Sequence, residues 1–229
     1  TYTISLQVNE NGCTSPQTDF NVTVYQVPTS SFIIPATACE GDDITVTYNG
    51  NATQNATYTW THVGGVLVSG AGQGPLTVNY SAANTYPITL TVTEDGCVST
   101  NTQQNLLVYP TPIALAGVDV NICSGTPANI GANALPGYTY QWAPAAGLSD
   151  PNISNPAITL TNNIPGNLVQ IFTLTVTSNG CTNTDEVEVT IRPNPSAILN
   201  LPPAQCLSGN NFNFAAAGNF GAGATFFWT

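Results

Sequence analysis

The sequence is short of charge, and above all of positive charge. Its 229 residues include 1 Lys or Arg, 12 Asp or Glu and 1 His, which gives a formal net charge of -11. Charged residues make up 6% of the chain, against about 25% in an ordinary soluble domain. One basic side chain cannot neutralise a phosphate backbone, so nucleic acid is excluded as a partner. An anionic membrane surface is disfavoured for the same reason.

Long apolar runs and methionine are also missing. No run approaches the roughly 18 apolar residues that a membrane-spanning helix needs, so no membrane insertion is expected in this segment. There is no Met and no basic, signal-like N-terminal region, and the chain is therefore expected to be a mature or internal piece of a longer protein. Hydrophobic residues still make up 42%, which is enough to build a core and argues against disorder.

What the chain does contain is an internal repeat. Six cysteines form two interleaved series with a period of 84 or 83 residues: Cys13, Cys97 and Cys181, and Cys39, Cys123 and Cys206. Trp60, Trp142 and Trp228 form a third series, and each follows an aromatic residue two positions earlier. Three markers in step predict a tandem array. The predicted divisions are the C-terminal part of a repeat (1–27), two complete repeats (28–111 and 112–195) and the N-terminal part of another (196–229).

The repeat has the pattern of β-structure. In "PITLTVTEDGC", Ile88, Leu90 and Val92 alternate with threonines, which is typical of a strand with one buried face. Asp95-Gly96, like Asn11-Gly12 and Asn179-Gly180 in the other copies, is a strong signal for a hairpin turn with two positive φ angles. About seven short strands per repeat, with a Trp on the third, predict an all-β fold of tandem immunoglobulin-like (PKD-like) β-sandwiches. Short proline-bearing linkers predict a semi-rigid, head-to-tail rod.

These motifs resemble a known family. A Cys-x-Gly before the second strand, Tyr-x-Trp on the third, and "TLTVTSNGCT" at the final hairpin are similar to the Ig-like and PKD-like repeats of giant cell-surface adhesins in gliding Bacteroidota, of the SprB type. The resemblance implies a part in adhesion and gliding motility, export by a type IX system, and an extracellular place on the outer cell surface. Two departures are that the PKD-type "WDFGDG" is absent and that Thr126-Pro127 weakens the second strand of repeat 112–195.

The cysteines are expected to form a disulfide framework, because they recur regularly in a chain expected to be secreted. No Cys-x-x-Cys pair occurs and His62 is the single imidazole, so no metal or cofactor is expected. The pairing stays open between bonds within a repeat (Cys39–Cys97 and Cys123–Cys181), free thiols, and bonds between repeats. In an Ig-type sandwich the turn before the second strand and the last hairpin lie about 25 Å apart, beyond the ~7 Å Cα separation of a disulfide. The preferred pairing is therefore Cys39 with Cys181 across repeats, with these partnered in neighbouring repeats: Cys13, Cys97, Cys123 and Cys206.

Candidates for catalysis or metal binding are weak. No nucleophile motif accompanies His62, and Glu186 and Glu188 alternate with valines on one solvent-facing strand. The sequence therefore predicts no enzyme. A cluster of three carboxylates, Glu40, Asp42 and Asp43, is a weak calcium candidate, since the matching positions of the next repeat carry none.

The aromatic pairs, Tyr58 with Trp60 and Tyr140 with Trp142, are expected to fill the core together with Trp228, and stacking on sugar is the alternative. The favoured function is a non-catalytic structural or adhesive stalk segment of a large secreted bacterial surface protein. Its expected partners are neighbouring repeats of the same chain, with lateral self-association and extracellular polysaccharide as further possibilities. The alternatives are an array of polysaccharide-binding modules and accessory repeats of a secreted hydrolase.

Overall fold

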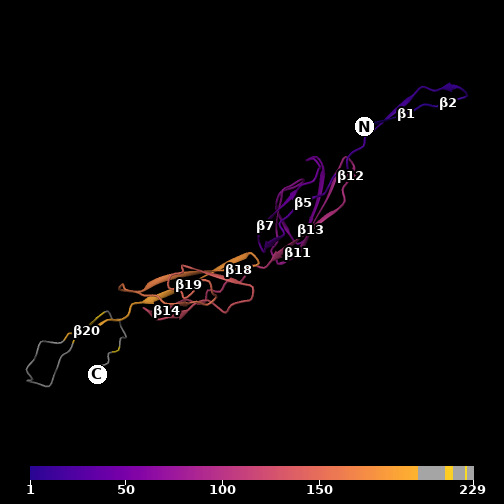
Figure 1. The fold of residues 1–229 in the computed structure, drawn as a ribbon. Helices are drawn as coiled ribbons and strands as arrows, with labels where there is room; N and C mark the ends of the chain where they lie inside the picture. Colours follow the sequence, from indigo (N-terminus) through magenta and orange to yellow (C-terminus); the bar gives the residue numbers. More distant parts are fainter. Residues whose placement is uncertain (201–214, 219–224, 226–229) are drawn as a thin grey trace, which may run out of the picture. The chain divides into compact units, whose positions relative to one another are not determined.

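The computed structural model describes residues 1–200, 215–218 and 225, and all regular structure in that part of the chain is β-strand. The chain divides into two compact units, 1–110 and 111–229. Each holds an immunoglobulin-like sandwich, which confirms the predicted all-β, immunoglobulin-like fold, whereas the head-to-tail rod stays a prediction (Figure 1). No helix long and apolar enough to cross a bilayer occurs among these residues. The predicted repeat limits stay predictions.

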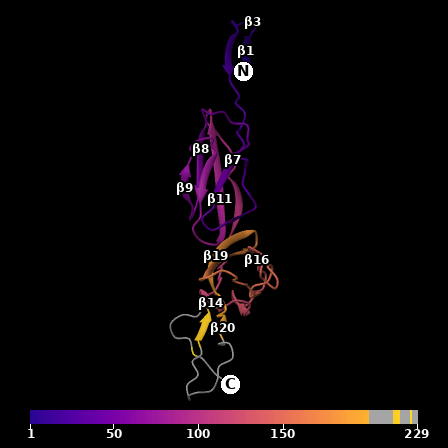
Figure 2. The ribbon, with the colours of Figure 1, turned by 90° about the vertical axis from the view of Figure 1, so that its left-hand side faces the viewer.

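The sandwich of unit 1 consists of two four-stranded sheets, and a short strand extends one of them. One sheet has the order β5-β7-β10-β9, with bounds Phe32–Ile33, Asp43–Tyr48, Leu76–Asn79 and Val66–Ser69. The other has the order β6-β13-β11-β8, with bounds Thr37–Cys39, Thr102–Tyr109, Asn84–Glu94 and Thr57–His62. The short strand, β12 (Cys97–Val98), pairs with the end of β11. Figure 2 labels strands of both sheets of this unit, β7 and β9 of the first and β8 and β11 of the second.

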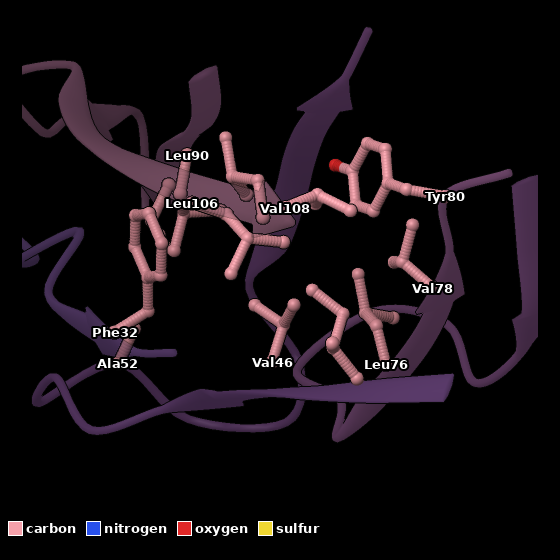
Figure 3. Packing of buried hydrophobic residues seen from close by; sticks show 12 residues of the cluster. Phe32, Val46, Ala52, Leu76, Val78, Tyr80, Leu90, Leu106 and Val108 are labelled. Atoms are coloured by element: carbon pink, nitrogen blue, oxygen red, sulfur yellow. The ribbon is translucent and has the colours of Figure 1, made fainter. Parts of the chain in front are cut away.

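The core of unit 1 follows from the alternation seen in the sequence. From Ile88 to Val92 every second residue of β11 is buried, and Ile88, Leu90 and Val92 are at most 1% exposed. Across from them, Val46 of β7 and Val78 of β10 are fully buried (Figure 3). Two faces of alternating strands thus close on each other, and burying this apolar area is the main source of the unit's stability.

Unit 2 has the same plan with a reduced second sheet. Its main sheet has the order β14-β19-β18-β16, with bounds Val120–Cys123, Cys181–Arg192, Leu168–Ser178 and Thr139–Ala143. The facing sheet has two short strands, β15 (Ala128–Asn129) and β17 (Ala157–Ile158). Where β7 has six residues, β15 has two. Thr126-Pro127 lies immediately before β15, and proline cannot donate a ladder hydrogen bond.

The hairpin turns agree closely across the copies. The residue pairs at the predicted turns have φ angles of 52° and 81° at Asn11-Gly12, 50° and 80° at Asp95-Gly96, and 51° and 83° at Asn179-Gly180. Positive φ at both positions is the requirement of a type I′ turn. The turn prediction is therefore confirmed in all three copies.

Two of the three hairpins contain a bulge that the third lacks. Ser99 donates its backbone N–H to Val92 O (2.8 Å), and its hydroxyl accepts the Val92 N–H (2.9 Å). Ser15 makes the same pair of bonds with Val8 (2.8 and 3.0 Å). In unit 2 the pairing of β18 with β19 runs without a break from Leu168 to Cys181. The hairpin of unit 2 therefore has one residue fewer after Cys181 than the other hairpins have after their cysteines. This accounts for the spacing of 83 residues between Cys123 and Cys206, where the other cysteine spacings of the repeat are 84.

Residues 1–27 form a hairpin, and no other sheet formed by the described residues pairs with it. β1 (Tyr2–Leu6) pairs with β4 (Thr18–Val22), and β2 (Asn9–Glu10) pairs with β3 (Cys13–Thr14). The register of β1 with β4 matches that of β11 with β13 residue for residue at an offset of 84. Ile4 and Leu6 nevertheless remain 59% and 65% exposed. Pairing and turn thus form the same way with and without a core.

Replacing Tyr80 with phenylalanine should stabilise unit 1. Tyr80 is 1% exposed, stacks on Tyr86 with ring centroids 4.3 Å apart, and turns its hydroxyl into the cluster (Figure 3). Among the described residues that hydroxyl has no hydrogen-bond partner, and burial raises the pKa of Tyr80. An unsatisfied buried hydroxyl costs about 1–3 kcal/mol, so Tyr80→Phe should raise the free energy of unfolding by about 1 kcal/mol in urea denaturation.

The matched control is Tyr48→Phe in the same unit. The Tyr48 hydroxyl donates to Thr29 O and accepts from the Ala52 N–H, both at 2.8 Å. Its loss should lower the free energy of unfolding by about 1–2 kcal/mol. Equal losses for the two variants would show that the Tyr80 hydroxyl has a stabilising role.

Candidate functional site: cysteines at the two ends of each unit

Cys39 lies at the end of unit 1 where the chain leaves, here called the distal end. It is the last residue of β6, which runs parallel to β13 with Cys39 opposite Tyr109. The next residue, Glu40, donates its N–H to Tyr109 O at 2.9 Å. Since unit 1 ends at Pro110, one residue beyond Tyr109, the parallel pairing itself places Cys39 at the distal end.

Unit 2 repeats this arrangement at Cys123. This residue ends β14, which runs parallel to β19 with Cys123 opposite Arg192. Ser124 N–H donates to Arg192 O at 2.8 Å, and Asn194 Nδ2 donates to Ser124 O at 3.1 Å. Both bonds hold the turn after Cys123 against the segment that leaves the sandwich.

Cys97 and Cys181 lie at the end where the chain enters each sandwich, the proximal end. Cys97 directly follows the Asp95-Gly96 turn. Beyond it, Thr102 begins β13, and its Oγ1 forms a hydrogen bond of 2.7 Å with the Oγ of Ser30. Cys181 follows the equivalent turn of unit 2. There Asn183 Nδ2 donates to Pro112 O at 3.0 Å, which ties the hairpin to the first residues of the unit.

The sulfur atoms at these positions are in two states. Cys39 and Cys181 are disulfide-bonded, whereas Cys13, Cys97 and Cys123 are free. Because Cys97 and Cys123 are free, neither pairing within a repeat, Cys39–Cys97 or Cys123–Cys181, is made in this structure. Cys206 lies outside the described residues.

The acidic cluster beside Cys39 braces the turn between β6 and β7. Asp42 Oδ2 accepts the Cys39 N–H (3.0 Å), Asp43 Oδ1 accepts from Asn79 Nδ2 (2.9 Å), and Glu40 Oε1 accepts the Ala83 N–H (2.7 Å). In the described part of the chain no group of three or more His, Cys, Asp or Glu side chains could hold a metal ion. The three carboxylates serve three different hydrogen bonds around the backbone that carries Cys39.

The aromatic residues of the repeat pattern lie in or against the two cores. Trp142 is 2% exposed, and its Nε1 donates to Ile153 O at 2.9 Å. Trp60 is half-buried, packs edge-on against Phe32 with ring centroids 5.2 Å apart, and donates Nε1–H to Gly72 O at 2.9 Å. The partly buried pair Tyr58 and Tyr140 packs against the same two clusters. Trp228 lies outside the described residues.

Two of the candidate catalytic side chains, His62 and Glu186, lie close to polar groups of neighbouring strands and loops. His62 ends β8, and its Nδ1 lies 3.2 Å from Gly65 O. Glu186 and Glu188 are both exposed on β19, and Glu186 accepts a hydrogen bond from Thr173 Oγ1 at 3.1 Å. The pKa of Glu94 is lowered because the Thr53 hydroxyl and backbone N–H both donate to its Oε1, a loop-bracing role near the Asp95-Gly96 turn.

Sequence reasoning missed the side chains that fasten each hairpin to the incoming chain. Ser30 in unit 1 and Asn183 in unit 2 make these bonds, and neither belongs to an evident motif. A signal did exist for Ser15 and Ser99, the bulge serines, since both stand two residues after a hairpin cysteine. The third copy has Asn183 there, and its amide instead reaches the incoming chain.

No family model matches the sequence, and no curated protein matches it either. Among solved structures the chain is similar to the titin I-band fragment I67–I69, with 10% identity, a TM-score of 0.36, and coverage of 75% of this chain and 68% of that one. It is also similar to extracellular domains 3–5 of Drosophila OTK, with 10% identity, a TM-score of 0.39, and coverage of 83% and 70%. It is similar as well to the insect immune protein hemolin, with 12% identity, a TM-score of 0.40, and coverage of 84% of this chain and 56% of that one.

Proposed function

We propose that this chain is a non-catalytic structural and adhesive stalk segment of a large secreted bacterial surface protein. The observation that supports it is the layout of each unit. In both sandwiches the strand before the exit, β13 or β19, begins beside the incoming chain and ends where the chain leaves. Such a unit can be followed by another of its kind at its far end, so repeats add length. A stalk of this kind displays binding regions, or adheres weakly at many points.

We further propose that Cys39 and Cys181 are bonded to each other and tie consecutive repeats together. Cys39 lies opposite Tyr109, and Cys181 stands two residues before Asn183, which binds Pro112 O. Tyr109 and Pro112 are three residues apart, a reach of about 10 Å at most. The attachment of both cysteine-bearing segments to the ends of one short linker supports the proposed bond. By the same logic Cys13, Cys97, Cys123 and Cys206 are partnered in neighbouring repeats.

The cellular setting of the proposal comes from the resemblance to the repeats of gliding Bacteroidota adhesins. It comprises type IX export, an extracellular place on the outer cell surface, and a part in gliding motility. The burial of Trp142 weighs against the alternative of polysaccharide modules, because a buried indole offers no stacking face to a sugar. Lateral self-association of stalks is a further possible use of the uncharged surface.

The proposal is tested in the producing bacterium. Antibodies against residues 1–229 should label intact cells. An in-frame deletion of residues 28–195 should shorten the surface structures and reduce the attachment of cells to surfaces. Duplication of 28–195 serves as the control, because it changes length without removing any other segment. Labelling confined to lysed cells, or normal attachment after the deletion, would contradict the stalk function. Specific binding of the 229-residue chain on a glycan array would favour the module alternative instead.

A further inference from the structure

Each sandwich is crossed from end to end by two segments that pair in parallel at its distal end. In unit 1 these are residues 28–39, which end in β6, and β13, which pairs with β6 in parallel. In unit 2 the first is the segment that ends in β14 and the second is β19, and β14 and β19 are again parallel. One member of each pair ends in a cysteine at the distal end. The other begins at or shortly after a cysteine at the proximal end, since β19 begins at Cys181 and β13 begins five residues after Cys97. The remaining strands lie between these cysteines in sequence.

We infer that the disulfides give the array a second covalent route along its length, which carries tension past the bulk of each sandwich. The route runs along 28–39, through a Cys39–Cys181 bond, and along β19 (Cys181–Arg192). Residues 40–180 then form a closed loop outside this route and carry no tension. The inference rests on the proposed stalk function for its use, since only a stalk is pulled at both ends.

The same reasoning assigns the free cysteines as disulfide sites. The chain itself connects β13 of unit 1, which follows Cys97, with the segment that ends at Cys123 in unit 2. Bonds from Cys97 and Cys123 to the matching cysteines of neighbouring repeats would extend this stretch into another continuous route. Each bond forms when two thiols give up two protons and two electrons to a disulfide-bearing oxidant, which is reduced to its dithiol.

The disulfide should have a large effect on the length of chain that is released by pulling, because the two segments that form the route are already extended. Pulling an unbridged sandwich apart releases its whole chain, at up to about 3.5 Å per residue. A Cys39–Cys181 bond withholds roughly 140 residues, or about 500 Å of contour length, from the pulled chain. Bonds within repeats would instead withhold two loops of roughly 58 residues each, about 200 Å apiece.

Single-molecule force spectroscopy on the 229-residue chain, held by its two termini with free thiols blocked, separates these outcomes. Without reductant the chain should reach a contour length about 500 Å shorter than with reductant. Cys39→Ser should give the long contour in both conditions, and Cys97→Ser should behave like the parent chain. An equal contour with and without reductant overturns the inference. So does a Cys39→Ser chain that gains only about 200 Å and releases the rest on reduction.

Thiol mapping of the natural protein tests the assignment of the free cysteines. In the 229-residue chain Cys97 and Cys123 should react with an alkylating agent without reductant, whereas in the natural protein both should react only after reduction. Reaction of both in the natural protein overturns that assignment. Trypsin is unsuitable for the digest because the single arginine, Arg192, precedes a proline. The load route and the stalk function fail separately, because contour length is measured on the isolated chain and attachment on cells.

Discussion

Trp142→Ala should lower the free energy of unfolding of unit 2 by about 3–5 kcal/mol, because it leaves a large cavity in the smaller of the two sandwiches. The indole is 2% exposed and lies on β16 opposite Leu174 of β18. Its Nε1–H bonds to Ile153 O, so the substitution also leaves that carbonyl without its donor. Because β15 and β17 are only two residues long, the facing sheet has few backbone hydrogen bonds that could offset the loss of packing.

Amide hydrogen exchange on β18 and β19 measures this loss in unit 2 alone. The matched control is Trp60→Ala, read on β11 and β13 of unit 1. Trp60 occupies the equivalent strand position but is only half-buried, so its loss should cost less, about 2 kcal/mol. A smaller effect at Trp142 than at Trp60 would mean that the Trp142 side chain is not central to its core.

Gly131→Ala should destabilise unit 2 by at least about 3 kcal/mol, for two reasons that add up. Gly131 has φ +85°, where an L-residue is strained by about 1–2 kcal/mol. A Cβ there would lie 2.0 Å from Ser154 O and 2.9 Å from Trp142 Cζ2. Moving the backbone at Ser154 disturbs a buried residue, and Gly131 itself donates its N–H to Ala116 O at 2.8 Å. The close approach of two backbones is what requires glycine here.

Gly137→Ala isolates the contribution of the backbone angle. Gly137 has φ +78°, and a Cβ there would meet nothing within 4 Å. Its substitution should therefore cost only about 1–2 kcal/mol, the strain of a positive φ. The difference between the two variants, from hydrogen exchange on β18 in the full chain, gives the cost of the steric clash. Equal losses at both positions would show that Ser154 and Trp142 yield without penalty.

Much of the local structure could be predicted because it depends on near neighbours. The alternation of Ile88, Leu90 and Val92 with threonine indicated a strand, and Asp95-Gly96 indicated its turn; both are confirmed. The period in cysteines and tryptophans indicated repeated sandwiches, and each unit does contain one. These signals are short-range preferences of backbone angles and side-chain period, which the sequence states directly.

The candidate site was only partly predictable. Its cysteines were evident, but their placement at the two ends of a sandwich depends on the parallel pairing of β6 with β13 and of β14 with β19. Nothing in the short segments before Cys39 and Cys123 states which distant strand they will join. The role of Glu40 and Asp43 in bracing a turn likewise depends on Ala83 and Asn79, which lie about 40 residues further on.

The sequence alone determined the strands, the turns and the hairpin register, since residues 1–27 form the same hairpin as residues 84–109 although Ile4 and Leu6 stay exposed among the described residues. Only the tertiary structure decided which of the same side chains are buried. Leu90 is fully buried under the second sheet of unit 1, while Leu6, its equivalent one period earlier, is 65% exposed. Local hydrogen bonding can fix a hairpin, whereas removing an apolar side chain from water needs an opposing surface supplied by a distant part of the chain.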